Sequence, residues 1–380
     1  MEERDLIIGI HIRDDVFQIS CQRGLIEGMS IENEEIPKDI KEEEDVTTKA
    51  VLFAAKIKQV LKEQGLEAFE KELRLLVFTA KDIGGKTGEF LKALKDGPFS
   101  ALPDVRIIKE KEALFHYVIN QPRELKGFEV LVIDMIDDEL IINRAITERG
   151  RRPLPVLIED EDNEGLSRPN DAMTGEQKDR ALSILDAELS ALCENILKTH
   201  IVTGIYLLGE VFEAGWYTLT RDVLCKNRRV FVGSNLYSRG ACLYASDSLY
   251  EKEKADSYLF ISEDILKHNI GVKIRKNGSE VTEFVIEGGR PYRDATASFT
   301  FIPDHDLSLP IVIRPIRGDI TDRVVPLPIP KEKDREPGSM RFKCNLSLES
   351  DHELLVIVED VGMGELYPST GKRYKEVITL

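Results

Sequence analysis

The sequence predicts a two-domain protein, with an α/β front domain over residues 1–260 and an all-β rear domain over residues 261–380. The chain has 380 residues, which is longer than one hydrophobic core usually serves. Strand-like apolar runs alternate with amphipathic stretches in the front part, whereas short alternating runs separated by turn residues follow from Gly271 onward. The 42% hydrophobic content is enough to fill a core in each domain.

The front domain is expected to open with a β-hairpin. Residues 6–12 and 16–21 are β-branched runs on either side of the turn Arg13-Asp14-Asp15. Apolar residues recur at helical spacing over 47–65, and Gly65 ends that helix. The other predicted strands are 73–79, 105–108, 128–133, 140–145, 204–209 and 230–233, and the other predicted helices are 87–95, 110–120 and 176–198. The polar stretch 151–175 is predicted to be a loop, and residues 240–242 complete the domain.

The rear domain is expected to be a β-sandwich or barrel without a helix of normal length. Its turn signals are Asn277-Gly278, Gly288-Gly289, Arg317-Gly318 and Ser350-Asp351-His352. Pro326, Pro328, Pro330 and the charged run 331–336 predict a loop between strands. The last strands are predicted at 340–348, 353–359 and 373–380.

Composition excludes several classes of function. The formal charge of −17 disfavours binding to nucleic acid and to anionic lipid. No apolar run is long enough to cross a bilayer, and no signal-peptide segment precedes the first strand, so we expect a cytoplasmic protein. The five cysteines and six histidines are scattered, which predicts reduced thiols and no metal site. The acidic runs 41–45 and 159–164 fit solvated loops better than docking tails for a basic protein.

The order of these segments resembles the DnaK-type heat-shock chaperone family, in which an actin-like (ribonuclease-H-like) ATPase domain precedes a peptide-binding β-sandwich. The stretch 106–113 looks like the family's connecting motif, with Glu110 in the place of a catalytic glutamate. Residues 207–209 and 233–241 look like the adenosine strand and the glycine-alanine helix. Residues 340–346 and 353–360, with the turn Thr370-Gly371-Lys372, resemble strands of the sandwich.

The resemblance implies a set of site residues. Glu110 and Asp134 would be catalytic if the protein is an active ATPase, and ATP or ADP with magnesium would be the cofactor. Gly9, His11, Gly209 and Gly233 would contact the nucleotide. Phe284, Ile286, Phe299 and Phe301 would line a peptide cleft, although alternating strands also place such residues in an ordinary core.

Both phosphate hairpins depart from the family pattern. The first keeps Gly9-Ile10 but carries His11 and Arg13-Asp14-Asp15 where small hydroxyl residues stand in the family. The second reads Asp134-Met135-Ile136-Asp137-Asp138-Glu139, so only its aspartate survives. Added carboxylates repel a polyphosphate, and the side chains of Met135 and Ile136 are expected to block close approach of the backbone. Roughly 70 residues separate Asp134 from the Gly204 strand, too few for the subdomain that clasps adenine in the family.

Three local patterns have two interpretations each. Asp134, Asp137, Asp138 and Glu139 could hold a divalent cation, but turn propensity alone explains aspartates at a hairpin tip. His11 and Glu110 could be an acid and base pair, against the more common structural histidine. Gly84-Gly85-Lys86-Thr87 matches the end of a phosphate loop, yet Ala80 replaces the upstream glycine.

We therefore expect a degenerate chaperone-like protein, not an active enzyme, that binds a peptide or protein partner as an adaptor or scaffold. The alternatives are an active ATP-dependent ATPase that uses Glu110 and Asp134, and an actin-like structural protein that assembles with itself. The sequence leaves the oligomeric state and the identity of the partner open.

Overall fold

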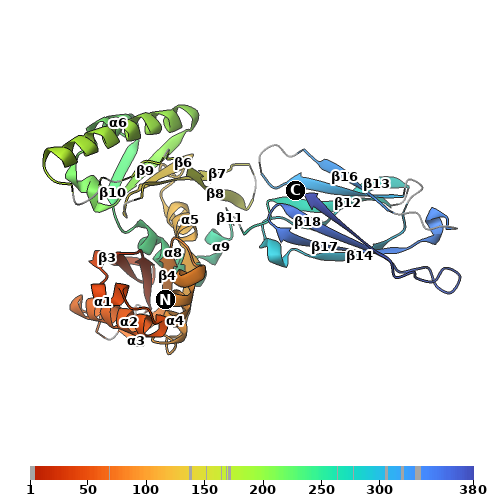
Figure 1. Ribbon diagram of the computed structural model, residues 1–380, viewed down its shortest axis with the longest axis horizontal. Coiled ribbons are helices and arrows are strands. Elements are labelled where there is room, and N and C mark those ends of the chain that lie inside the picture. The colour runs from red at the N-terminus through yellow and green to blue at the C-terminus, as the bar shows by residue number, and fades with distance from the viewer. Residues whose placement is uncertain are drawn as a thin grey trace. The chain divides into compact units, whose positions relative to one another are not determined.

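The protein forms two compact units, Met1–Phe260 and Ile261–Leu380, shown in Figure 1. This computed structural model describes residues 5–380 except 68, 137–138, 151, 164, 168, 170–172, 263, 277, 304–306, 318–320 and 330–334. Each unit has its own hydrophobic core, and each is described by itself below.

The first unit is built from two sheets joined by helices. Its elements in chain order are β1 (Leu6–Ile12), β2 (Val16–Arg23), β3 (Ile26–Glu35), α1 (Lys38–Lys41), α2 (Val46–Glu63), α3 (Phe69–Glu72), β4 (Leu73–Ala80), α4 (Gly85–Asp96), β5 (Val105–Lys109), α5 (Glu110–Asn120), β6 (Glu129–Asp134), β7 (Ile141–Thr147), β8 (Leu154–Glu161), α6 (Glu176–Thr199), β9 (Val202–Leu208), η1 (Glu210–Ala214), α7 (Thr218–Leu224), β10 (Arg229–Gly233), α8 (Leu236–Leu249), α9 (Lys252–Ala255) and β11 (Tyr258–Ile261).

The two sheets of this unit repeat one topology. The first has the order β3-β2-β1-β4-β5, and the second has the order β10-β9-β6-β7-β8-β11. In each, the first three strands in chain order pair antiparallel and the next two add in parallel, so β6 to β10 correspond one by one to β1 to β5. A helix follows the last strand of each repeat, α5 in the first and α8 in the second. This doubled α/β arrangement agrees with the actin-like front domain that the resemblance implies.

Helices α5 and α8 pack between the two sheets. One face of β1, β4 and β5 shares a core with Ala113 of α5 and Ala241 and Ala245 of α8. The facing side of the second sheet packs on Leu114 and Val118 of α5 and on Leu236 and Tyr237 of α8. The outer faces of the sheets are covered by α2 and α4 in the first repeat and by α6 and α7 in the second. The carboxyl ends of β1 and β6 therefore meet around the first turn of α5.

This close packing depends on glycine at the points of contact. A Cβ on Gly9 would lie 2.3 Å from Ser238 O and 2.8 Å from Cys242 N, because β1 runs directly against α8. A Cβ on Gly240 would lie 2.2 Å from Ala113 O, where α8 crosses α5. Backbone atoms cannot yield to such a contact without moving a helix, so these glycines hold the two repeats together.

Most predicted elements of the front domain are confirmed, and several others were missed. The β1–β2 hairpin, α2, α5 and the long helix α6 lie where the hydrophobic periodicity predicts them. Strand β3 and helix α7 were not predicted, and the predicted loop 151–175 is wrong over β8. The acidic end of β8 hides its strand pattern, yet residues 156–161 pair with β7. Residues 240–242 belong to helix α8.

The second unit is a sandwich of two four-stranded antiparallel sheets. Its elements are β12 (His268–Lys276), β13 (Ser279–Ile286), η2 (Tyr292–Asp294), β14 (Ala297–Phe301), β15 (Ser308–Pro315), β16 (Arg323–Pro328), η3 (Pro337–Ser339), β17 (Phe342–Ser350), β18 (Glu353–Asp360) and β19 (Arg373–Thr379). The strand orders are β13-β12-β15-β16 and β14-β17-β18-β19, and side chains from both sheets fill one core. The all-β prediction is confirmed.

One part of the predicted rear loop is a strand. Pro326 and Pro328 lie in β16, which among the described strands pairs with β15 alone and forms the edge of its sheet. Proline lacks the N–H that an inner strand must donate, so an edge strand is where a sheet accepts it. Residues 330–334 of that predicted loop lie outside the described residues.

No helix among the described residues is long and apolar enough to cross a membrane.

The glycine contacts predict a sharp difference between two substitutions. Gly9→Ala should lower the free energy of unfolding by roughly 1–3 kcal/mol, because its Cβ meets backbone atoms of α8. Gly233→Ala is the matched control, since nothing lies within 4 Å of its Cβ position. Urea unfolding followed by circular dichroism measures both, and equal stability of the two variants would contradict the packing described here.

Candidate functional site

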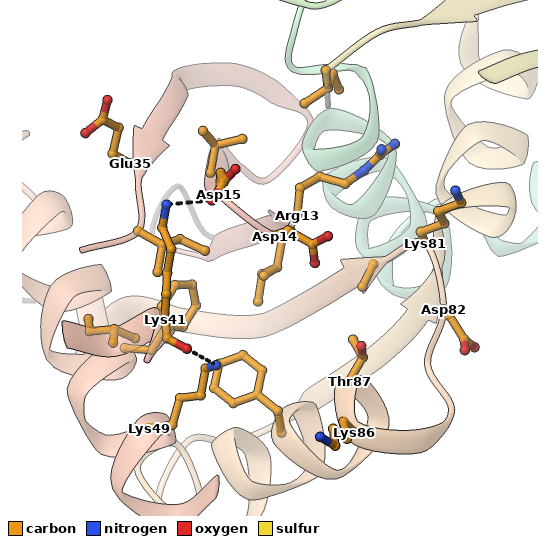
Figure 2. A pocket seen from close by; sticks show the side chains of 18 of the residues that line it. Arg13, Asp14, Asp15, Glu35, Lys41, Lys49, Lys81, Asp82, Lys86 and Thr87 are labelled. Carbon is orange, nitrogen blue, oxygen red and sulfur yellow. Dashed lines mark hydrogen bonds and ion pairs between the residues drawn. The ribbon is translucent and has the colours of Figure 1, made fainter. Parts of the chain in front are cut away.

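An open cleft of about 1560 Å³ lies in the first unit and contains the turn after β1. Figure 2 shows this turn, with Arg13, Asp14 and Asp15, facing the start of α4 across the cleft. Arg13 N donates to Val16 O at 2.9 Å, and Ile36 N donates to Asp15 O at 2.8 Å, so the turn is fixed by its own backbone and by β3. A cleft of this size is large enough to hold a small-molecule ligand.

Arg13 is buried at the floor of this cleft between two carboxylates. Its Nε donates to Glu110 Oε1 at 2.6 Å and its Nη2 donates to Glu110 Oε2 at 3.0 Å. The same Nη2 donates to Asp134 Oδ2 at 2.6 Å. His11 Nε2 lies 2.6 Å from Glu110 Oε1. The four residues, called the Arg13 cluster below, are at most 7% exposed, so solvent hardly screens these contacts.

The Arg13 cluster shifts the two carboxyl groups in opposite directions. Burial raises the pKa of Glu110, but the charge of Arg13 and the hydrogen bond from His11 outweigh it, and the pKa is lowered overall. For Asp134, burial dominates and raises the pKa despite the nearby Arg13, and the charge of Glu110 adds to the rise. Burial, with the charges of Asp134 and Glu110, also raises the pKa of Tyr237 well above its ordinary value. Tyr237 packs on the His11 ring with centroids 4.9 Å apart.

A chain of hydrogen bonds extends the cluster into both repeats. His11 Nδ1 lies 3.1 Å from Gln18 Oε1, and Gln18 Nε2 donates to Asn33 Oδ1 at 2.8 Å. Asn33 Nδ2 then donates to Glu210 Oε1 at 2.8 Å and to Ser234 Oγ at 3.2 Å. Strands β1, β2 and β3 of the first repeat are thus bonded to the segments that follow β9 and β10 in the second. Together with the Arg13 contact to Asp134, these bonds tie the two repeats at the cleft floor.

The donor set does not fit a magnesium nucleotide. Each oxygen of Glu110 and Asp134 already accepts a hydrogen bond, since Ile136 N donates to Asp134 Oδ1 at 2.9 Å. A divalent cation would have to displace the guanidinium of Arg13, which occupies the space between the carboxylates and carries a like charge. No group of three or more His, Cys, Asp or Glu side chains in the described part of the chain is arranged to hold a metal ion.

The charge of the cleft wall also disfavours a magnesium nucleotide. Among the described residues that line it, ten carboxylates stand against five cations. The carboxylates are Asp14, Asp15, Glu35, Glu42, Glu43, Glu44, Asp82, Glu89, Glu139 and Glu210, and the cations are Arg13, Lys41, Lys49, Lys81 and Lys86. Lys41 Nζ is 2.6 Å from Asp15 Oδ1, and Lys81 Nζ is 2.6 Å from Glu139 Oε2, so two of the cations are already neutralised. A polyphosphate meets a net negative wall here.

The three glycines predicted to contact a nucleotide lie in different environments. Gly9 is in the middle of β1 and packs against α8, not against the cleft. Gly209 lines the cleft with φ +115°, and its Cβ position lies 2.5 Å from Met135 O, so it allows the turn after β6 to pack closely. Gly233 ends β10 and has open space around it. Close packing of backbone on backbone explains the first two glycines without a phosphate.

The turn after β6 differs from the expectation that its side chains block the site. Met135 is fully buried in the core under α6, so it points away from the cleft. Ile136 lines the cleft, as that expectation requires. Glu139 is bound to Lys81, and Asp137 and Asp138 lie outside the described residues, so the proposed four-carboxylate cation site stays a prediction.

The segment Gly84-Gly85-Lys86-Thr87 begins helix α4 at the rim of the cleft. Gly84 N, which a phosphate loop would offer to an anion, donates to Asp82 Oδ1 at 2.9 Å. Figure 2 shows Lys86 and Thr87 at the start of α4 with Asp82 close by. One backbone donor of this segment is therefore already bonded to a carboxylate of the protein itself.

The four residues expected to line a peptide cleft do not share a surface in the second unit. A bulge at residue 285 pairs Ile270 with Ile286 and Gly271 with Phe284, so these two side chains point to opposite faces of the sheet. Ile286 is 2% exposed in the core, whereas Phe284 stacks under Arg314 on the outer face. Phe299 and Phe301 lie on β14 in the other sheet and pack at the margin of the core.

Three of the four members of the Arg13 cluster, His11, Glu110 and Asp134, were predicted as site residues, whereas Arg13 was not. The polar triplet Arg13-Asp14-Asp15 fits an exposed hairpin turn equally well, and only Asp14 and Asp15 are exposed. The available signal is that His11, in the strand just before this turn, was already considered as a partner of Glu110. A buried carboxylate needs a cation, and Arg13 lies two residues from His11 in the sequence.

Removal of Arg13 should be costly unless its partners are neutralised as well. Arg13→Met leaves two buried carboxylates without a counter-charge and should lower the free energy of unfolding by about 3–5 kcal/mol. The triple variant Arg13→Met, Glu110→Gln, Asp134→Asn should regain a large part of this loss. Chemical unfolding measures each variant, with Lys86→Met at the exposed cleft rim as control. Simple additivity of the three substitutions would show that the charges do not interact.

The opposite pKa shifts predict opposite effects of acid. Because the pKa of Glu110 is lowered in the folded protein, its contribution to stability is present above the ordinary glutamate value of 4.5 and is lost as the pH falls below it. Because the pKa of Asp134 is raised, protonation on acidification favours the folded state. Glu110→Gln should therefore lessen the loss of stability in acid, and Asp134→Asn should enlarge it. Thermal melts across the acid range, with the exposed Glu89→Gln as control, measure this; parallel curves would contradict it.

Solved structures with a likeness to this chain share little sequence with it. The activator of the 2-hydroxyisocaproyl-CoA dehydratase from Clostridium difficile with bound ADPNP is 10% identical, with a TM-score of 0.40, over 66% of this chain and 97% of its own. A ROK hexokinase from Thermus thermophilus is 11% identical, with a TM-score of 0.37, over 63% of this chain and 97% of its own. Component A of the (R)-2-hydroxyglutaryl-CoA dehydratase from Acidaminococcus fermentans is 10% identical, with a TM-score of 0.38, over 66% of this chain and 99% of its own.

Two family models match the sequence, and neither is that of a chaperone. A comparison with curated proteins finds no match. Residues 265–380, in the β-sandwich, match a domain of unknown function, DUF8552. Residues 26–263 match the model described as the C-terminal part of a family of unknown function, DUF5716. Membership of the DnaK-type family stays a prediction, whereas the match over more than half of the chain shows that this protein belongs to the DUF5716 family.

Proposed function

We propose that this protein is a non-catalytic adaptor or scaffold, in which a doubled α/β unit of actin-like architecture binds a protein or peptide partner without turning over a nucleotide. The observation that carries the proposal is the contact of Arg13 with both Glu110 and Asp134. These two carboxylates are the groups that an ATPase reading of the sequence needs for its metal and its chemistry. Here they neutralise an arginine of the same chain.

Electrostatics support this choice over an active ATPase. A guanidinium held by charge-assisted hydrogen bonds on two sides, in a site of low exposure, is expensive to displace. The acidic cleft wall also disfavours the approach of a polyphosphate, because its carboxylates outnumber its cations. In an ATPase, a metal nucleotide would have to displace Arg13 and also overcome the repulsion of the acidic cleft wall.

Structural roles account for the remaining features that resembled an active site. Gly9 serves the contact of β1 with α8. The hydrogen bonds from Gln18 to Asn33 and from Asn33 to Glu210 join the two repeats. Such a unit keeps the fold rigid at its centre and leaves its outer surfaces for partners. A scaffold needs stable surfaces more than it needs a cleft that opens and closes.

A nucleotide titration tests the proposal. Isothermal titration with ATP and magnesium should give no heat of binding, and the melting temperature should not change with ADP at roughly millimolar concentration, because a ligand that binds only the folded state must raise stability. The control is magnesium chloride alone, which corrects for ionic strength. Heat of binding together with a raised melting temperature would contradict the mismatch described at the Arg13 cluster. Release of phosphate from ATP by the protein that binds it would overturn the proposal and favour the active ATPase.

A further inference from the structure

Strand β10 forms an open edge of the second sheet in the first unit. It pairs in parallel with β9 over all five residues, and no described strand pairs with its other side. Figure 1 shows β10 as the outermost strand of that sheet. An open edge presents backbone N–H and C=O groups that can pair with another extended chain.

Cations without an ion partner gather at the start of this edge. Lys226 and Arg229 are exposed, and Arg228 is half-buried with Nη1 donating to Lys226 O at 3.0 Å. None of the three forms an ion pair with any described residue. They precede or begin β10 just after Asn227, whose φ of +61° turns the chain toward the strand. A chain with a net charge of −17 thus carries three unpaired positive charges on one sheet edge.

Apolar side chains continue from this cationic start along both faces of β10. Phe231 is 39% exposed and Val232 is 46% exposed, so each face of the strand offers one unfilled apolar contact. Phe231 stacks on Tyr206 of β9 with centroids 5.1 Å apart, and Tyr206 in turn meets Tyr117 edge-on at 5.3 Å. This row of aromatic rings stops at the open edge. Another strand would extend it, since aromatic and β-branched residues on adjacent strands stabilise each other.

We propose that the β10 edge takes up an extended acidic segment of a partner protein as an added strand. Carboxylates of that segment pair with Lys226, Arg228 and Arg229, and its apolar residues pack beside Phe231 and Val232. The β10 edge of a second copy, Arg229–Gly233, carries no carboxylate to pair with these cations, so it lacks the charge complementarity of an acidic segment. The inference rests on the proposed adaptor function and names the chemistry of its partner.

A labelled peptide tests the inference with the full-length chain. The probe is a capped peptide that alternates glutamate and valine, with one that alternates lysine and valine and one in which prolines interrupt the acidic pattern as comparisons. Fluorescence anisotropy should show binding of the first probe only. Lys226→Glu with Arg229→Glu should weaken that binding by about tenfold or more. Lys62→Glu with Lys92→Glu is the matched control, because these exposed lysines of α2 and α4 carry the same charge change far along the chain from β10.

Hydrogen exchange distinguishes an added strand from simple charge attraction. Binding of the acidic peptide should slow exchange of amides in β10, since backbone pairing protects them. Absence of binding, equal weakening in both double variants, unchanged exchange in β10, or equal binding of the proline-interrupted peptide would overturn the inference. Binding of single-stranded DNA at the same edge with equal strength would overturn it too, because the edge would then be an unspecific anion surface. None of these outcomes depends on nucleotide, so the adaptor proposal stands or falls separately on its own titration.

Discussion

Arg13 is the one charge on which the centre of this protein depends. An arginine at 7% exposure is stable only when carboxylates neutralise its guanidinium, and Glu110 from α5 and Asp134 from β6 supply them. The same pairing holds the first repeat to the second, because Arg13 belongs to one and Asp134 to the other. Burial makes each contact strong and makes the loss of either partner costly. The central cleft is thus organised around an ion pair of the protein itself.

The duplicated topology explains why this pairing falls where it does. Two sheets with the same strand order place the carboxyl ends of β1 and β6 at equivalent positions beside the first turn of α5. In such an arrangement the two strand ends face each other across the helix pair α5 and α8. Gly9 and Gly240 allow that pair to approach the sheet and one another at backbone distance. Arg13, which follows β1, therefore lies beside Asp134, which ends β6.

Much of this architecture could be predicted from periodicity, and the omissions have physical causes. Helices α2 and α6 have apolar residues at helical spacing, which identifies them as helices. Strands β1 and β6 are short continuous apolar runs, which is typical of buried strands. Strand β8 ends in acidic residues that pair with Arg144 on the neighbouring strand, so its pattern depends on a contact distant in sequence. The bulge at residue 285, which separates Phe284 from Ile286, has no local signature. Glu110, His11 and Asp134 were predicted as site residues because the order of segments resembles the DnaK-type family, whereas Arg13 was placed in the hairpin turn Arg13-Asp14-Asp15 without a role.

The likeness in segment order to the DnaK-type family therefore concerns the fold and does not extend to the residues of the cleft. The α/β unit followed by a β-sandwich is present, while the groups that would perform phosphate chemistry serve the cohesion of the fold. A crystal structure of the protein grown with ATP and magnesium tests this account most directly. The account predicts that Arg13 Nη2 stays within hydrogen-bond distance of Asp134 and that no metal lies between Glu110 and Asp134. Magnesium held by these two carboxylates, with Arg13 displaced from them, would contradict it.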